Sequence, residues 1–320
     1  MPMNEHDTHC GNKELYRCFI NAFVVIMHFC IVAVNASETL EVYVPTYPGL
    51  YGETVIGLGG FSDMVFSPNG QYIVGSGESG IYVIDAKTLE LILPILYSRK
   101  SNRFLAISPD SCTAAVDDYR DNSITIYDAE TGKENCRIHV NEPIRKFAFS
   151  PDNSKIAFVS DNFIGYADVD DGDMISIHQI DLLLESVLFS ADGKKLLFGG
   201  LQGIVYELEL YSDTLSPCFQ PGFTIEILAG VREKESLIAV GGRSGRIQLW
   251  NAETKEMLCE LSGHTGTVYS FSLANDGKRL ISGSNDGTAR IWDIREVSGL
   301  KGWKFLSSLI DPVRIASTIE

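Results

Sequence analysis

The six residues "GSGESG", at positions 75–80, match the pattern G-x-G-x-x-G, which can cradle the phosphates of a dinucleotide. A phosphate loop of this kind needs a strand before it and a helix after it, because the N-terminus of the helix stabilises the phosphate charge. The next residues, 81–85 ("IYVID"), are β-branched or aromatic and predict a strand. We therefore interpret the glycines as part of a tight hairpin turn and not as a nucleotide site.

A second stretch with possible chemistry is "DVDDGD", at positions 168–173, which is similar to the start of a calcium-binding loop. An EF-hand loop carries Glu at its twelfth position, where this sequence has Gln179, so an acidic turn is the better interpretation. The sequence contains no H-E-x-x-H, G-x-S-x-G or P-loop motif, and its six histidines form no cluster with metal-ligand spacing. We predict no catalytic residue, no metal site and no cofactor.

The composition limits the classes of function. The chain has 320 residues, of which 45% are hydrophobic, enough for a sizeable core in one large β domain or two ordinary domains. Its net charge of -16 disfavours general binding to nucleic acid or to an anionic membrane, both of which need clustered Lys and Arg. The cysteines beyond the N-terminal region are far apart and predict isolated buried thiols, with neither a zinc site nor a disulfide framework: Cys112, Cys136, Cys218 and Cys259.

A short phrase recurs along the chain, in which an apolar strand ends in Ser-Pro-Asp or a variant of it. Its Asp or Asn recurs every 40 to 42 residues, with one copy missing near residue 234: Asn69, Asp110, Asp152, Asp192 and Asp276. Each unit reads as four short strands separated by turns, and no segment has helical periodicity of useful length. A fixed period of this size predicts an all-β fold, a β-propeller of four-stranded blades.

One unit, residues 261–293, closely resembles a WD repeat, with Gly-His at 263–264 and Trp-Asp at 292–293. The resemblance implies a structural tetrad, joined by hydrogen bonds inside one blade, at the matching residues His264, Ser282, Asp286 and Trp292. We expect its role to be structural, because buried polar groups must find partners. A catalytic triad would also need an exposed nucleophile and an oxyanion site, which the sequence does not indicate.

The other units depart from this pattern, although the resemblance extends over nearly all of the chain after residue 38. None of them has the His. The Trp position holds Ile84, Tyr127, Ala167, Leu208 and Trp250, and the Asp position holds Glu78, Asp121, Asp161, Gln202 and Ser244. These blades are expected to rely on apolar packing between sheets.

The number of blades depends on both ends of the chain. Six units have complete inner strands, residues 303–317 resemble the start of a seventh, and residues 39–44 and 53–58 resemble two of its other strands. We expect seven blades, the seventh incomplete and closed by both termini, because closure of the ring removes exposed strand edges. Six blades is the alternative, and a truncated gene would also explain the abrupt end.

The N-terminus differs from the rest of the chain. Residues 18–34 are mostly apolar, Lys13 and Arg17 precede them, and small residues follow at 34, 36 and 37. This layout predicts a signal peptide over residues 1–36, cleaved after Ala36, and a propeller over residues 37–320. The alternatives are an uncleaved membrane anchor and a miscalled start, so the predicted location is periplasmic or extracellular, otherwise membrane-anchored or cytoplasmic. An exported WD-repeat protein would be similar to bacterial members of the family.

A last set of residues lies five positions before the Ser or Ala of each turn phrase. In WD-repeat proteins this position often lies at the mouth of the central channel, where partners bind. The residues are Ser62, Arg103, Arg145, Glu185 and Tyr269, with Arg314 in the partial unit. We expect Arg103, Arg145, Tyr269 and Arg314 to form a positive patch for an acidic partner, with solvated surface arginines as the alternative.

These observations predict a non-catalytic scaffold that presents its loops to protein partners, and they predict no nucleic-acid partner. Contact with a membrane is expected only if the N-terminal segment stays as an anchor. The alternative function is a propeller enzyme or a small-ligand sensor that uses the central channel, since propellers serve both classes.

Overall fold

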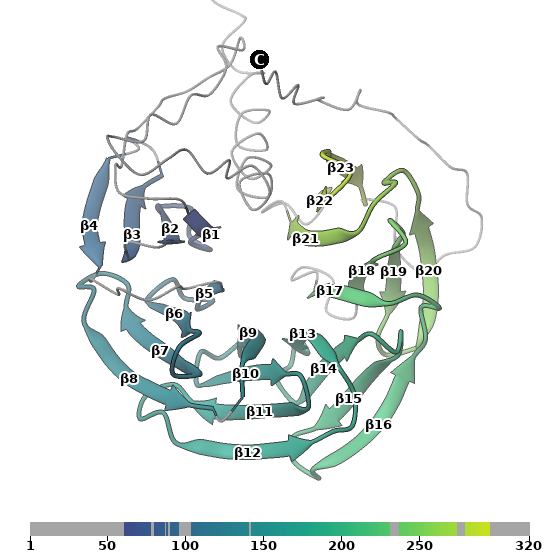
Figure 1. Cartoon of the computed structure of the whole chain (residues 1–320), viewed down its shortest axis with the longest axis horizontal. Helices are drawn as coiled ribbons and strands as arrows, with labels where there is room; N and C mark the ends of the chain where they lie inside the picture. The colour runs from purple at the N-terminus through teal and green to yellow at the C-terminus, as the bar shows by residue number, and fades with distance from the viewer. Residues whose placement is uncertain are drawn as a thin grey trace, which may run out of the picture.

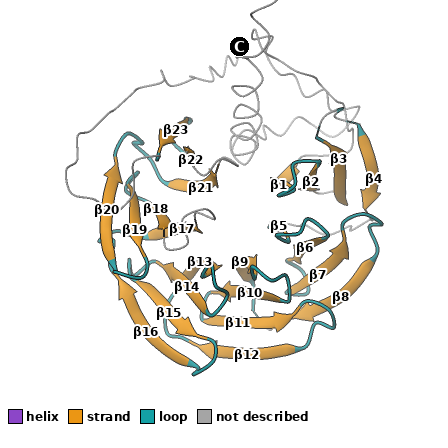
Figure 2. Ribbon diagram, turned by 180° about the vertical axis from the view of Figure 1, so that it is seen from behind, coloured by secondary structure: helices purple, strands orange, loops and turns teal. Residues whose placement is uncertain are grey.

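The computed structural model describes residues 61–294, apart from residues 78–79, 87, 89, 96–103, 141, 231–236 and 274–278. The described residues form strands and turns without a helix, and the strands make six antiparallel sheets. Figures 1 and 2 show these sheets following one another around a central axis, each as one blade with its first strand innermost. The prediction of an all-β propeller with four-stranded blades is confirmed.

The first three blades have four strands each, paired in chain order. Blade 1 contains β1 (Phe61–Phe66), β2 (Tyr72–Gly77), β3 (Gly80–Asp85) and β4 (Leu91–Ile95). Blade 2 contains β5 (Leu105–Ile107), β6 (Thr113–Asp118), β7 (Ser123–Asp128) and β8 (Glu134–His139). Blade 3 contains β9 (Ile144–Phe149), β10 (Lys155–Ser160), β11 (Phe163–Asp168) and β12 (Met174–Gln179).

The next three blades repeat the same pairing, and three strands of the last one are described. Blade 4 contains β13 (Leu184–Phe189), β14 (Lys195–Gly200), β15 (Val205–Glu209) and β16 (Thr214–Phe219). Blade 5 contains β17 (Ile225–Gly230), β18 (Leu237–Gly242), β19 (Ile247–Asn251) and β20 (Glu256–Leu261). Blade 6 contains β21 (Val268–Leu273), β22 (Arg279–Ser284) and β23 (Ala289–Asp293).

The number of described blades, six, agrees with the six-blade alternative and not with the prediction of seven. The segments expected to supply the seventh blade, residues 39–58 and 303–319, lie outside the described residues. Within the described part, each innermost strand contacts that of the next blade, from β1 through β5, β9, β13 and β17 to β21.

The recurring turn phrase closes the first hairpin of a blade. In blade 3 the Ser150 hydroxyl donates to Asp152 Oδ1 at 2.6 Å, and the Lys155 N–H donates to Ser150 Oγ at 2.9 Å. Corresponding bonds occur in blades 1, 2 and 4. One short phrase thus satisfies the polar groups of the turn, which explains why the phrase recurs.

The same turns also join neighbouring blades. The Asn69 N–H donates to Ser111 Oγ in the next blade at 3.1 Å, and the Asp110 N–H donates to Asn153 Oδ1 at 3.1 Å. Ser111 and Asn153 have positive φ angles of 69° and 65°, and the glycines at the corresponding turn positions of blades 1 and 4, Gly70 and Gly193, have φ angles of 70° and 69°. These two links were not predicted from the sequence.

The hydrophobic core lies between the blades. Five clusters of buried apolar side chains each combine residues from two successive sheets. Phe158 in blade 3 and Phe198 in blade 4 are fully buried. A Cβ at Gly165 would lie 2.6 Å from the Phe158 ring, so the glycine leaves the space that the ring occupies. The fold therefore rests on packing between sheets, as the degenerate units led us to expect.

The stretch "GSGESG" includes the end of β2, at residues 75–77, and the first residue of β3, Gly80. Gly77, at the end of β2, pairs with Gly80, at the start of β3. The element that follows is a strand, so the stretch belongs to a hairpin, as predicted.

Candidate functional site

The four residues of the predicted tetrad lie together in blade 6. His264 precedes β21, Ser282 lies on β22, Asp286 lies in the β22–β23 turn and Trp292 lies on β23. His264 Nδ1 is 2.9 Å from Asp286 Oδ2, and His264 Nε2 is 2.7 Å from Ser282 Oγ. The Trp292 indole N–H donates to the same Ser282 oxygen at 2.8 Å.

These contacts have one consistent direction of donation. The indole N–H donates to Ser282, the Ser282 hydroxyl donates to Nε2 of a neutral His264, and the Nδ1–H of His264 donates to Asp286. Burial lowers the pKa of His264, and the hydrogen bond and charge of Asp286 only partly oppose this effect. A neutral imidazole is therefore the form that the structure favours.

Asp286 accepts more bonds than the family pattern predicted. Its two oxygens also accept the Thr265 N–H, the Thr288 N–H and the Thr288 hydroxyl at 2.9, 2.9 and 2.6 Å. Burial alone would raise the pKa of Asp286, but the bonds from Thr288, Thr265 and His264 lower it to about 2. The carboxylate links the loop before β21 to the β22–β23 hairpin. The two threonines were missed because the family pattern does not include them.

A second polar site is the end of the ring where the innermost strands begin. In five blades the pairing between the first and second strands skips the second residue of the first strand, which forms a β-bulge. The bulge residues are Ser62, Arg145, Glu185, Glu226 and Tyr269. A bulge redirects the side chain of its extra residue. The same backbone irregularity therefore recurs in five blades at one end of the ring. We call these five residues and their ion-pair partners the rim.

Glycines opposite two bulges allow the chain to come close. Gly200 pairs with the first residue of β13, and Gly242 pairs with the first residue of β17. A Cβ on either glycine would lie 1.9 Å from a backbone oxygen, that of Leu183 or of Thr224. Any larger residue would push the loop away, so the bulge geometry depends on these glycines.

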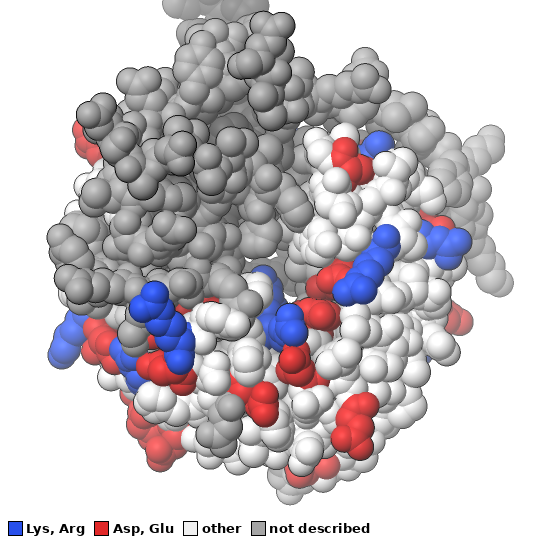
Figure 3. Space-filling model, viewed as in Figure 1, with Lys and Arg blue, Asp and Glu red and all other residues white. Residues whose placement is uncertain are grey.

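The charges of the rim form pairs. Arg145 Nε donates to Asp161 Oδ1 at 2.6 Å, and Asp161 lies in the β10–β11 turn. Arg243 Nε, in the β18–β19 turn, donates to Glu226 Oε1 at 2.5 Å. Figure 3 likewise shows positive side chains next to negative ones on the face in view. With Glu185, the described rim has two arginines and three carboxylates.

The predicted positive patch is therefore absent from the described part of the rim. Arg145 is at the predicted position, but Asp161 compensates its charge. Tyr269 is also at the predicted position, with 37% of its surface exposed. Arg103 and Arg314 lie outside the described residues. Glu226 was missed because the turn phrase of its unit is degenerate, although the repeat period places it 41 residues after Glu185.

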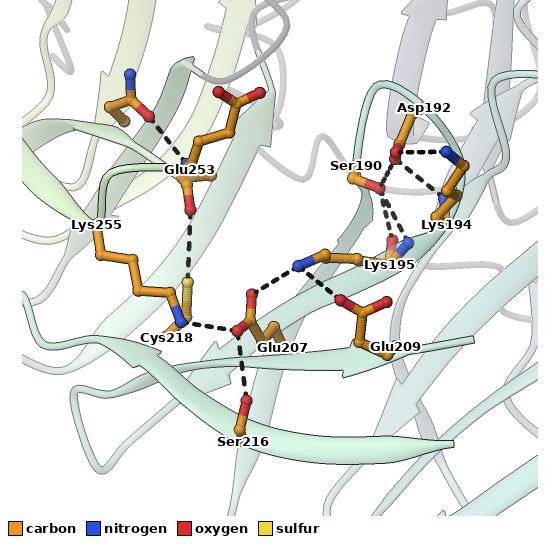
Figure 4. A network of polar contacts seen from close by, with 12 residues as sticks. Ser190, Asp192, Lys194, Lys195, Glu207, Glu209, Ser216, Cys218, Glu253 and Lys255 are labelled. Atoms are coloured by element: carbon orange, nitrogen blue, oxygen red, sulfur yellow. Dashed lines mark hydrogen bonds and ion pairs between the residues drawn. The ribbon is translucent and has the colours of Figure 1, made fainter. Parts of the chain in front are cut away.

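A third polar cluster lies between blades 4 and 5 and is shown in Figure 4. The nearly buried Glu207 accepts from Lys255 at 2.7 Å, from Ser216 at 3.3 Å and from Lys195 at 3.5 Å. Burial alone would raise the pKa of Glu207, but the two lysines lower it. Lys255 comes from the β19–β20 turn, so the cluster links blade 4 to blade 5. The Glu207 carboxylate already has its partners within this cluster.

The remaining reactive groups offer no further site. The four described cysteines are free thiols; burial raises the pKa of Cys136, Cys218 and Cys259 to about 11. The prediction of buried thiols is correct for Cys218, whereas Cys136 and Cys259 are partly exposed and Cys112 is exposed. In the described ranges, no group of three or more His, Cys, Asp or Glu residues could hold a metal ion. The described residues also include no helix long and apolar enough to span a membrane.

Comparison with known proteins gives one family match and several relatives. Residues 255–293 match the family described as "WD domain, G-beta repeat". The chain is 24% identical over 246 residues to Apoptotic protease-activating factor 1 of Danio rerio, which covers 72% of this chain and 18% of that protein. It is 24% identical over 184 residues to Eukaryotic translation initiation factor 3 subunit I of Culex quinquefasciatus, covering 58% and 48%. A segment of 62 residues is 44% identical to APC/C activator protein CDC20 of Saccharomyces cerevisiae, covering 19% and 10%.

The chain spans less than half the length of each of these relatives. The family match covers β20 to β23 and the loops between them, which together contain all four tetrad residues: Ser282 and Trp292 on strands, and His264 and Asp286 in loops. What this chain shares with the relatives is thus its repeated blade.

Proposed function

Because the chain belongs to the WD-repeat β-propeller family, we propose that it is a non-catalytic scaffold that binds a protein partner at the rim. The observation that carries this proposal is the shared bulge position. Five blades keep the same backbone there but carry Ser, Arg, Glu, Glu and Tyr. A backbone geometry that is the same in each blade, with polar and aromatic side chains that differ between blades, is suited to recognition of a protein surface.

The tetrad supports a structural role over a catalytic one. Ser282 has no exposed surface, and its oxygen lies between the Trp292 indole and His264. A nucleophile must reach its substrate, and this hydroxyl is enclosed in the blade. We propose that the four residues hold the loop before β21 in place, and so help to fix the position of Tyr269.

A crosslinking experiment tests the scaffold proposal. A photo-crosslinking phenylalanine analogue replaces Tyr269 at the rim of blade 6 or, in the control, Glu253 in the β19–β20 turn of blade 5, at the end of that blade away from the rim. We expect a discrete protein adduct from position 269 and none from position 253, with the adduct competed by untagged protein. The partner, once identified by mass spectrometry and purified, should bind the wild type and lose affinity for Tyr269→Ala. Equal labelling from both positions, or none from 269, would argue against the rim as the binding site.

A further inference from the structure

Glu185 is a rim carboxylate without a partner among the described residues, and we propose that it binds a lysine or arginine side chain of a basic protein segment. The inference rests on the proposed function, because it names the chemistry of the partner at the same rim. The proposed partner is basic, whereas the sequence predicted an acidic partner.

Glu185 lies at a β-bulge on the innermost strand of blade 4. It is the bulge residue of β13, between Leu184, which pairs with Gly200, and Ser186, which pairs with Gly199. Its side chain is half-buried, and no hydrogen bond or ion pair within the described residues satisfies its carboxylate. A charged group that is partly removed from water without a partner is costly, so the site is open to a cation.

The two arginines near Glu185 already have carboxylate partners. Arg145 is bonded to Asp161 and Arg243 is bonded to Glu226, one on each neighbouring blade. Burial raises the pKa of Glu185; the charges of Arg145 and Arg243 oppose this effect, while Glu226 and Asp161 add to it. The balance leaves the carboxylate poorly stabilised, and an incoming cation would supply the missing charge.

Two exposed tyrosines lie near these arginines. Tyr119, in the β6–β7 turn, is 48% exposed. The bond to Asp161 is the main cause of the raised pKa of Arg145, and Tyr119 is close enough to make a smaller contribution. Tyr269 is 37% exposed. The bond to Glu226 is the main cause of the raised pKa of Arg243, and Tyr269 makes a smaller contribution. Exposed tyrosines contact the aliphatic stems and cationic ends of lysine and arginine favourably. Two exposed tyrosines thus lie near the arginines of the two blades on either side of Glu185.

The charge of the whole chain points to the same class of partner. With 42 acidic and 26 basic residues, the chain attracts basic segments and repels acidic ones at long range. An acidic partner would need uncompensated arginines, and both described rim arginines have carboxylate partners. The occupant that fits is therefore a basic peptide segment of a protein.

A displayed library of random peptides, selected on the immobilised full chain, tests the inference. We expect the selected peptides to be enriched in Lys and Arg, and their affinities are then measured by fluorescence anisotropy. Glu185→Gln should weaken these peptides by roughly tenfold or more, as removal of one partner of a desolvated ion pair does. Glu253→Gln removes the same charge in the β19–β20 turn and should change affinity by less than about twofold. Glu185→Lys should shift a new selection toward acidic peptides.

The outcomes separate the two proposals. Peptides that need Tyr269 but are not enriched in Lys or Arg, or that bind Glu185→Gln unchanged, would overturn the charge inference and leave the scaffold proposal standing. Selected peptides that are insensitive to every rim variant would overturn both. Circular dichroism and thermal unfolding of each variant establish that the propeller is folded in the binding assay.

Discussion

His264 and Asp286 together fix the charge state of the blade 6 tetrad. Every described partner of the Asp286 oxygens is a donor, so these bonds favour the ionised carboxylate over the protonated one. The imidazole uses one nitrogen to donate and the other to accept, which requires its neutral form. The arrangement therefore contributes stability only while Asp286 is ionised and His264 is uncharged.

We predict that Asp286→Asn lowers the free energy of unfolding by about 2 kcal/mol at pH 7. An amide nitrogen cannot accept the bonds that one carboxylate oxygen accepts. Because the pKa of Asp286 in the folded protein, about 2, lies below its unfolded value of 3.8, its contribution is present above pH 4 and is lost as the pH falls toward 2. Urea unfolding at pH 7 and pH 3 measures the difference.

The matched control is Asp170→Asn, which neutralises an exposed carboxylate in the β11–β12 turn. It should change stability by less than about 0.5 kcal/mol at either pH. An equal loss in both variants at pH 7 would assign the effect to net charge and not to the tetrad.

The contribution of Glu185 to stability should depend on pH in the opposite direction to that of Asp286. Burial raises the pKa of Glu185 above its ordinary value, so the folded state binds the proton more tightly than the unfolded chain does. Its contribution is therefore most favourable at low pH and is lost as the pH rises through the raised pKa. We expect Glu185→Gln to stabilise the protein at pH 7 by up to about 1 kcal/mol, with partial exposure limiting the gain. The gain should vanish near pH 4 in thermal unfolding, and a variant less stable than the wild type at pH 7 would contradict this prediction.

At the scale of elements, buried and exposed positions of one hairpin differ strongly. Ile164 on β11 has no exposed surface, whereas Ile177 on β12, the outermost strand of blade 3, is 46% exposed. We predict that Ile164→Ala costs about 2–5 kcal/mol of unfolding free energy, because it leaves a cavity between blades. Ile177→Ala should cost less than about 0.5 kcal/mol. Similar losses in urea unfolding for both variants would mean that the outer strand is covered in solution.

The repeat period was enough to predict the elements, but not the residues that project from them. The recurring Ser-Pro-Asp phrase located the first hairpins because each copy makes the same local bonds. The bulges depend on the pairing of strands, which a single strand does not reveal, so Glu226 and its bond to Arg243 were missed. The neutralisation of Arg145 by Asp161 was missed for a similar reason, since 16 residues separate the two.

At the scale of the whole molecule, the acidic composition should govern association. We expect binding of a basic segment to weaken with added salt, because exposed charges are screened within about 10 Å at 0.1 M ionic strength. The association rate constant, measured by stopped-flow fluorescence between 20 mM and 500 mM NaCl, should fall more than the dissociation rate constant rises. A rate independent of salt would show that the net charge of -16 plays no part in the encounter.

The N-terminal segment carries a separate prediction. Residues 1–36 lie outside the described residues, and their role as a signal peptide stays a prediction. If it is correct, N-terminal sequencing of the mature protein will begin at Ser37, and the protein will be found in the exported fraction. An intact Met1 in the cytoplasmic fraction would contradict it.

The repeated bulge has a consequence for how such a protein diversifies. The extra residue takes no part in the ladder between the first two strands, and the pairs on either side of it are kept. Under the proposed function, a mutation at this position would change what the ring recognises and would leave the strand pairs on either side intact. Selection can therefore act on specificity one blade at a time, and new partners can be acquired without first evolving a more stable scaffold.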